Sequence, residues 1–198
     1  RYPMMKMLKK SLIKLLWVVF GLVVSFQVCA SELSELLKKP DHVLLMRHAI
    51  APGIGDPAGY KLQDCKTQRN LDATGRAQAQ KTGQWLKAQG VGNALVFSSA
   101  WCRCKETAEN LAFGTPALEA SLNSFFDDMR QGSQSNANLQ KFIANQLKAK
   151  GDKALVLVTH QVNITQFTGE TVGSGDMVLA KVNAAGKMIS FKTYPSPS

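Results

Sequence analysis

The chain has 198 residues, a length that fits one domain, and its composition excludes several classes of protein. Hydrophobic residues make up 45% of it, which excludes disorder over most of its length, and a single long apolar run excludes a multi-pass membrane protein. The formal net charge is +10, but five basic residues lie in the first thirty positions with no acidic residue to offset them. The remaining 168 residues carry 19 Lys and Arg against 14 Asp and Glu, so we expect no binding to nucleic acid.

Residues 1–30 have the pattern of a secretory signal peptide. A basic stretch precedes an apolar run over 15–24, and Val28 and Ala30 are small residues placed as a signal peptidase requires. We therefore expect cleavage after Ala30, a single mature domain over 31–198 and a periplasmic location. The alternatives are a retained leader, which would be the only contact with a membrane, and a lipoprotein modified at Cys29.

Export would place the cysteines in an oxidising compartment, where they form disulfides. The mature chain holds Cys65, Cys102 and Cys104, and the last two are too close in sequence to bridge each other comfortably. We expect Cys65 to pair with one of them and leave one thiol free, and three unpaired cysteines are the alternative. The chain has three histidines and no cluster of Cys and His, so we expect neither a metal site nor a cofactor.

Helices and strands are predicted to alternate along the mature chain. The pattern predicts an amphipathic helix over 33–37, a strand over 42–48, a helix over 73–89, a strand over 94–97, a helix capped by Ser99 and ending near 112, a helix with its apolar stripe over 139–147, a strand over 154–158, a short helix ending near 169, and a hairpin over 177–182 and 187–192. Strands that are apolar throughout are typical of a parallel sheet buried on both faces. We therefore predict a three-layer α/β/α sandwich with a mostly parallel, Rossmann-like sheet and an edge hairpin.

Arginine and histidine side chains follow three of these strands at the point where each strand ends. Arg47 and His48 follow the first strand, Ser99 and Arg103 follow the second, and His160 follows the third. Because ligands bind beyond the carboxyl ends of strands in such sheets, we expect these side chains to form one anion site. Arginine matches phosphate oxygens with two parallel hydrogen bonds, and the helix after Ser99 would add backbone N–H groups. A neutral imidazole among arginines can attack a phosphoryl group and carry it as phosphohistidine until water releases it.

The motifs around these residues resemble those of the histidine phosphatase superfamily, which includes phosphoglycerate mutases and histidine acid phosphatases. The resemblance lies in residues 45–49 (LMRHA), 70–79 (NLDATGRAQA), 98–108 (SSAWCRCKETA) and 159–160 (TH), in the order that the family has them. It implies that His48 accepts the phosphoryl group, that Arg47, Arg103 and His160 hold its oxygens, and that the sheet is Rossmann-like. It also implies that no metal takes part.

The sequence departs from the family pattern at the residue that protonates the leaving oxygen. The acid phosphatase branch has an aspartate directly after its second histidine, where this chain has Gln161, which is not a useful proton donor. Asp127, Asp128 and Glu119 are candidates for that role, and we include Asp128 in the expected catalytic set. A site without a donor is the alternative, and it would suit a good leaving group, a phosphohistidine or a phosphoramidate.

The connection over 49–71 is long for a compact domain, and loops of that length are usually functional or disordered. We predict a lid or specificity loop beside the nucleophile, fastened by Cys65 to the helix that carries Arg103. Gln68 and Arg69 in this loop are predicted to contact the substrate, and an exposed pair without function is the alternative.

Together these features predict an exported phosphomonoesterase that works through phosphohistidine at His48. Its expected substrate is a phosphorylated small molecule or glycan, such as a sugar phosphate of the cell envelope. Two rival hypotheses are a catalytically silent module that binds phosphate or docks a partner, and a phosphotransferase or mutase that passes the group to an alcohol.

Overall fold

The computed structural model describes residues 31–198, so the predicted signal peptide and its cleavage site lie outside the described residues. The strands are β1 (His42–Arg47), β2 (Ala94–Ser98), β3 (Ala117–Leu118), β4 (Ala154–Thr159), β5 (Met177–Val182) and β6 (Met188–Tyr194). The α-helices are α2 (Glu32–Lys38), α3 (Ala73–Ala88), α4 (Cys102–Asn110), α5 (Gly132–Ala149) and α6 (Gln161–Thr168). Short 3-10 turns are η1 (Cys65–Thr67), η2 (Ala120–Leu122) and η3 (Met129–Gln131).

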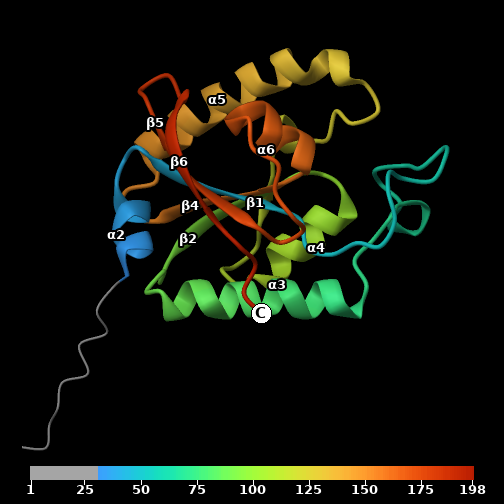
Figure 1. Ribbon diagram of the computed structural model, residues 1–198, viewed down its shortest axis with the longest axis horizontal. Coiled ribbons are helices and arrows are strands. Elements are labelled where there is room, and N and C mark those ends of the chain that lie inside the picture. The colour runs from blue at the N-terminus through green and yellow to red at the C-terminus, as the bar shows by residue number, and fades with distance from the viewer. Residues whose placement is uncertain (1–30) are drawn as a thin grey trace, which may run out of the picture.

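These elements form the predicted mostly parallel sheet with helices on both faces (Figure 1). The strand order is β3-β2-β4-β1-β5-β6, and the first four strands of this order run parallel. β5 pairs antiparallel with β1, and β6 pairs antiparallel with β5 at the edge. The three-layer fold and its edge hairpin are therefore confirmed. Within 31–198 no helix combines the length and apolar character that crossing a bilayer requires.

The central strands are apolar throughout because they feed two cores at once. Side chains alternate along a strand, so Leu44 and Met46 of β1 join the core under α2, α3 and α4. Val43 and Leu45 of the same strand join the core under α5 and α6. β4 is buried at every residue for the same reason. This packing fixes the central strands, whose carboxyl ends reach one edge of the sheet.

A buried lysine fixes α2 to the sandwich. The Nζ atom of Lys150 lies within 2.8 to 3.3 Å of the carbonyl oxygens of Leu37, Lys38, Gly151 and Lys153. Burial lowers the pKa of Lys150, and Asp152 and Asp41 oppose that shift. Lys150 therefore closes the carboxyl end of α2 and gives the last carbonyl groups of this helix a donor.

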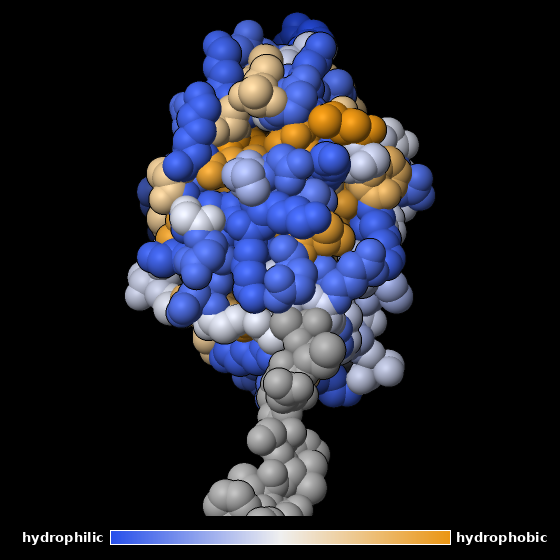
Figure 2. Space-filling model, turned by 90° about the vertical axis from the view of Figure 1, so that its left-hand side faces the viewer, coloured by the Kyte–Doolittle hydropathy of each residue, from blue (hydrophilic) through white to orange (hydrophobic). Residues whose placement is uncertain are grey.

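Figure 2 looks onto the side of the molecule where α2 lies, and most of that surface is hydrophilic.

Two details of the fold differ from the sequence-based expectation. Ser99 does not cap α4, because the helix begins three residues later, at Cys102, after the N-cap residue Trp101. The Ser99 hydroxyl instead lies 2.8 Å from Nε2 of His160, and it accepts a hydrogen bond from the Trp101 N–H at 3.3 Å. β3 was not predicted, since a two-residue exposed strand carries no hydrophobic pattern to detect.

Candidate active site

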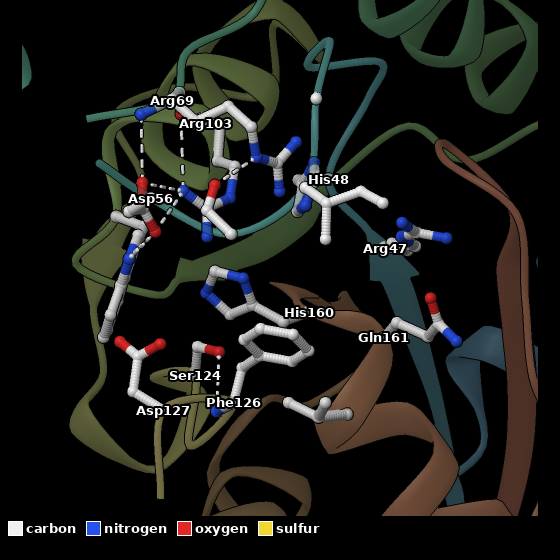
Figure 3. A pocket seen from close by; sticks show the side chains of 15 residues that line it. Arg47, His48, Asp56, Arg69, Arg103, Ser124, Phe126, Asp127, His160 and Gln161 are labelled. Carbon is white, nitrogen blue, oxygen red and sulfur yellow. Dashed lines mark hydrogen bonds and ion pairs between the residues drawn. The ribbon is translucent and has the colours of Figure 1, made fainter. Parts of the chain in front are cut away.

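A cavity of about 290 Å³ opens at the edge of the sheet where β1 and β4 end (Figure 3). Its walls come from the end of β1, the loop over 49–71, the start of α4, the segment after η2 and the start of α6. Five arginine and histidine residues named in the sequence analysis line it: Arg47, His48, Arg69, Arg103 and His160. The structure therefore brings the expected anion-binding side chains together from positions that are far apart in the chain.

His48 is held as a neutral imidazole with one free nitrogen. Its Nδ1 atom lies 2.7 Å from the carbonyl oxygen of Ala49, so Nδ1 donates there and Nε2 keeps its lone pair. Burial, with smaller contributions from Arg103, Arg69 and Arg47, lowers the pKa of His48 to about 3 against the opposing effect of the Ala49 hydrogen bond. The imidazole is therefore unprotonated at neutral pH, as a nucleophile must be.

His160 faces His48 across the cavity, with ring centroids 5.6 Å apart in an edge-on arrangement. The Ser99 hydroxyl lies closer to Nε2 of His160, at 2.8 Å, than to Oδ1 of Asn123, at 3.3 Å. Because Oδ1 of Asn123 can only accept, the Ser99 hydroxyl donates to it and accepts from Nε2–H of His160, which places the ring proton of His160 on Nε2. Burial lowers the pKa of His160 well below 6.5, and His48 and the arginines add to that shift. Ser99 does not line the cavity, so it acts on His160, and a contact with substrate is not supported.

The arginines present hydrogen-bond donors that no residue within 31–198 accepts. Nε of Arg47 and Nε of Arg103 are buried and have no hydrogen-bond partner there. Arg47 uses Nη1 to donate to the carbonyl oxygen of Val172 at 2.8 Å. Buried donors without an acceptor are rare in native proteins, and guanidinium donors suit phosphate oxygens. This part of the cavity is therefore built to bind an anion.

Asp56 orients Arg103, and no motif in the sequence predicted this role. Both carboxylate oxygens accept from Nη1 of Arg103, at 2.9 and 3.1 Å, and the pair is buried. Asp56 also accepts from Nε1 of Trp101 at 3.0 Å and from the Arg69 N–H at 2.9 Å. Burial raises the pKa of Asp56, but the hydrogen bonds from Arg103 and Arg69 outweigh it and the net pKa is lowered. Asp56 is therefore ionised at neutral pH, and it occupies Nη1 of Arg103 while leaving Nε without an acceptor.

A disulfide between Cys65 and Cys102 ties the loop over 49–71 to the first residue of α4. This confirms that Cys65 pairs with one of the two neighbouring cysteines, and Cys104 remains free and buried. Gln68 strengthens the same junction, because its Oε1 accepts from the Cys102 N–H at 2.9 Å. Its Nε2 donates to two carbonyl oxygens of the loop, and Gln68 does not line the cavity. The structure thus gives Gln68 a role in fixing the loop, in place of the expected contact with substrate.

One of the three candidate carboxylates reaches the cavity. Asp127 lines it and accepts a hydrogen bond from the hydroxyl of Tyr60 at 2.9 Å. Burial, followed by Asp127, raises the pKa of Tyr60 to about 12, so the hydroxyl keeps its proton. Asp128 lies outside the cavity, because it caps η3 and pairs with Arg130 at 2.7 Å, which corrects its place in the expected catalytic set. Glu119 caps η2 and also lies outside the cavity.

Arg69 is the third arginine of the cavity, and it is also a structural tie of the loop. Its Nε donates to the carbonyl oxygen of Gly55 at 2.8 Å, and its Nη1 donates to the carbonyl oxygen of Ala51. Burial lowers the pKa of Arg69, and Arg103 lowers it further.

Among residues 31–198, no group of three or more His, Cys, Asp or Glu side chains is placed to hold a metal ion.

Comparisons with known proteins agree with this geometry. The model of the histidine phosphatase superfamily (branch 1) matches residues 43–138. No curated protein matches the sequence significantly. The solved structure of the protein histidine phosphatase SixA complexed with tungstate is 19% identical, with a TM-score of 0.56, over 78% of this chain and 97% of that chain. A mycobacterial glucosyl-3-phosphoglycerate phosphatase is 13% identical, with a TM-score of 0.56, over 80% of this chain and 100% of that chain.

A third structure, described as mycobacterial hydrolase 1, is 13% identical, with a TM-score of 0.59, over 80% of this chain and 99% of that chain. At these identities the structures establish a shared fold, and the family model adds the motif segments that carry Arg47, His48 and Arg103. The chain is a member of the histidine phosphatase superfamily.

Proposed function

We propose that this protein is a phosphomonoester hydrolase that works through a phosphohistidine at His48. One observation carries the proposal: the unprotonated Nε2 of His48 shares a cavity with buried, unpartnered N–H groups of Arg47 and Arg103. A phosphoryl group held by those donors would lie beside a neutral nitrogen nucleophile. Phosphoryl transfer chiefly requires such positioning and neutralisation of charge.

In the first step, Nε2 of His48 attacks phosphorus and the bond from phosphorus to the ester oxygen breaks. The arginines compensate the charge on the phosphoryl oxygens, and the leaving oxygen takes a proton from the carboxyl group of Asp127. Asp127 is the candidate for this role because, of the three carboxylates considered, it alone lines the cavity. Asp56 is unsuited to it, since its pKa is lowered and Arg103 occupies its oxygens.

In the second step, water attacks the phosphorus of phosphohistidine and the bond to Nε2 breaks. The attacking water gives its proton to Asp127, inorganic phosphate leaves, and His48 returns to its neutral form. The Ala49 carbonyl supports both steps, because it holds the ring proton on Nδ1 and thereby directs Nε2 into the reaction.

We also propose that the mature protein is exported to the periplasm. Two features support this: the leader pattern over 1–30, and the disulfide between Cys65 and Cys102, which is typical of proteins in oxidising compartments. Cell fractionation with an antibody against the mature domain tests it. Recovery of the uncleaved chain in the cytoplasm would contradict it.

Hydrolysis of p-nitrophenyl phosphate tests the nucleophile. We expect His48→Gln to lower kcat/KM at least about 1,000-fold, because the covalent step is lost. His42→Gln is the matched control, since His42 is also buried but bonds Asp41 and does not line the cavity. Equal activity of His48→Gln and the wild type would contradict the proposal and favour a silent phosphate-binding module. Transfer to an added alcohol in preference to water would favour a phosphotransferase.

The role of Asp127 is tested by comparing leaving groups. We expect Asp127→Asn to lower the rate on an alkyl phosphate about 100-fold while changing the rate on p-nitrophenyl phosphate less than about threefold, because p-nitrophenolate leaves without protonation. Asp128→Asn is the matched control, and it should change neither rate. An equal loss on both substrates would assign Asp127 to binding or structure.

A further inference from the structure

Two exposed apolar side chains line the catalytic cavity, and a third lines the cavity next to it. Ile54 is 94% exposed and Phe126 is 53% exposed, and both line the cavity. Met129 is 60% exposed and lines a second cavity, which shares Gln161 and Val162 with the first. These three side chains are half of the six large hydrophobic side chains that are exposed within 31–198. Exposed apolar groups that gather at one opening mark a binding surface, whereas isolated ones need no explanation.

The turn that carries Ile54 is held in place, so the exposure of Ile54 is built into the loop. Gly53 and Gly55 on either side of it have φ angles of 95° and 69°, a left-handed conformation that glycine adopts without strain. Arg69 donates to the carbonyl oxygens of Gly55 and Ala51 and so fixes both ends of the turn. The isoleucine side chain is therefore presented to solvent by a fixed backbone beside the anion site.

Two polar side chains at the opening each accept one hydrogen bond from another residue. Asp127 accepts from Tyr60, and the Ser124 hydroxyl accepts from the Phe126 N–H at 3.2 Å. Gln161 remains as a polar side chain for which the structure records no partner within 31–198. An apolar group of a substrate would bury surface against Ile54 and Phe126 at this opening.

We infer that the apolar rim, defined as Ile54 and Phe126, binds the leaving group, so that the preferred substrate is a phosphomonoester of an alcohol with an apolar chain or ring. This inference rests on the proposed function and narrows it. The floor of the cavity neutralises the phosphoryl group, and the rim removes the remainder of the substrate from water. The inference favours an ester whose alcohol is apolar over the sugar phosphate predicted from the sequence.

Two alkyl esters with similar leaving groups test the inference. Hexyl phosphate and glycerol 3-phosphate both release a primary alcohol, so a difference in kcat/KM reports on binding of the alcohol. We expect kcat/KM for hexyl phosphate to be at least about tenfold higher, from apolar surface buried on the rim. Ile54→Ser and Phe126→Ser should each lower it about fivefold through a higher KM, and should change kcat/KM for glycerol 3-phosphate less than twofold.

Ile189→Ser and Phe191→Ser are matched controls. Both side chains are exposed, at 58% and 37%, on β6, and neither lines the cavity. These controls should change kcat/KM for neither substrate. Equal kcat/KM values for the two esters, or an equal loss on both in the rim variants, would overturn the inference.

Failure of the proposed function gives a different result. If no ester is hydrolysed faster than by His48→Gln, the enzyme proposal fails, and calorimetry with hexylphosphonate still tests the rim. Binding of hexylphosphonate that Ile54→Ser weakens about fivefold would support an apolar rim. Equal binding to the wild type and to Ile54→Ser would overturn it.

Discussion

Two buried cationic sites of this protein use their hydrogen-bond donors in opposite ways. Lys150 is surrounded by four carbonyl oxygens at the end of α2, whereas Arg47 has one carbonyl partner and a buried Nε without any within 31–198. Burial lowers the pKa of both side chains, so the direction of the pKa does not distinguish them. Their hydrogen-bond partners distinguish them. A buried cation whose donors are all occupied stabilises the fold, and one with free donors is ready to bind a ligand.

The largest expected effect comes from Arg47→Met. This substitution removes a phosphate-binding side chain, and we expect kcat/KM on p-nitrophenyl phosphate to fall about 1,000-fold, or about 4 kcal/mol of transition-state stabilisation. The free energy of unfolding in urea should fall by about 1 kcal/mol or less, because one hydrogen bond to Val172 is lost. Retained activity in this variant would show that Arg47 does not bind the phosphoryl group, and the distinction between Arg47 and Lys150 would be lost.

Lys150→Met should have the complementary effect. It leaves buried carbonyl groups at the end of α2 without a donor, and we expect the free energy of unfolding to fall by about 3 kcal/mol. Activity at 25 °C should stay within twofold of the wild type, because Lys150 does not line the cavity. Lys153→Met is the matched control, since that side chain is exposed. A loss of kcat without a loss of stability would show that the two sites are coupled.

The smallest effect expected is the pH dependence of stability that His48 causes. Its pKa is about 3 in the folded protein, against about 6.5 in the unfolded chain, so the unfolded state binds more protons between these values. Stability should therefore fall as the pH falls from about 6.5 towards about 3. Between pH 7 and pH 5 we expect the wild type to lose about 2 kcal/mol more than His48→Gln, measured by urea unfolding. Parallel losses would show that His48 titrates normally.

The fold could be predicted because the information that specifies it is local. The apolar runs of β1 and β4 and the apolar stripe of α5 appear as short patterns in the sequence, and the position of each strand end then follows. The meeting of His48 with His160 followed from topology, since parallel strands end at the same edge of a sheet.

The hydrogen-bond partners of the site residues were harder to predict from the sequence, because they lie in a loop without a periodic pattern. Asp56 lies 47 residues before Arg103, and its position depends on Arg69 and on the disulfide at Cys65. A negative charge in a glycine-rich loop carries no local signal of the arginine it will meet. The same reason hid the contact between Tyr60 and Asp127, and it explains why Asp128 was preferred.

The Cys65–Cys102 disulfide anchors the loop before α3 to the first residue of α4 and divides the loop into two arms. The arm before Cys65 holds Ile54 and Asp56, and its glycines permit the left-handed turn there. The arm after Cys65 stays with α4 through Gln68. Arg69 and Asp56 hold the first arm as Gln68 holds the second, so the contacts proposed for the alcohol and those proposed for the phosphate share one support.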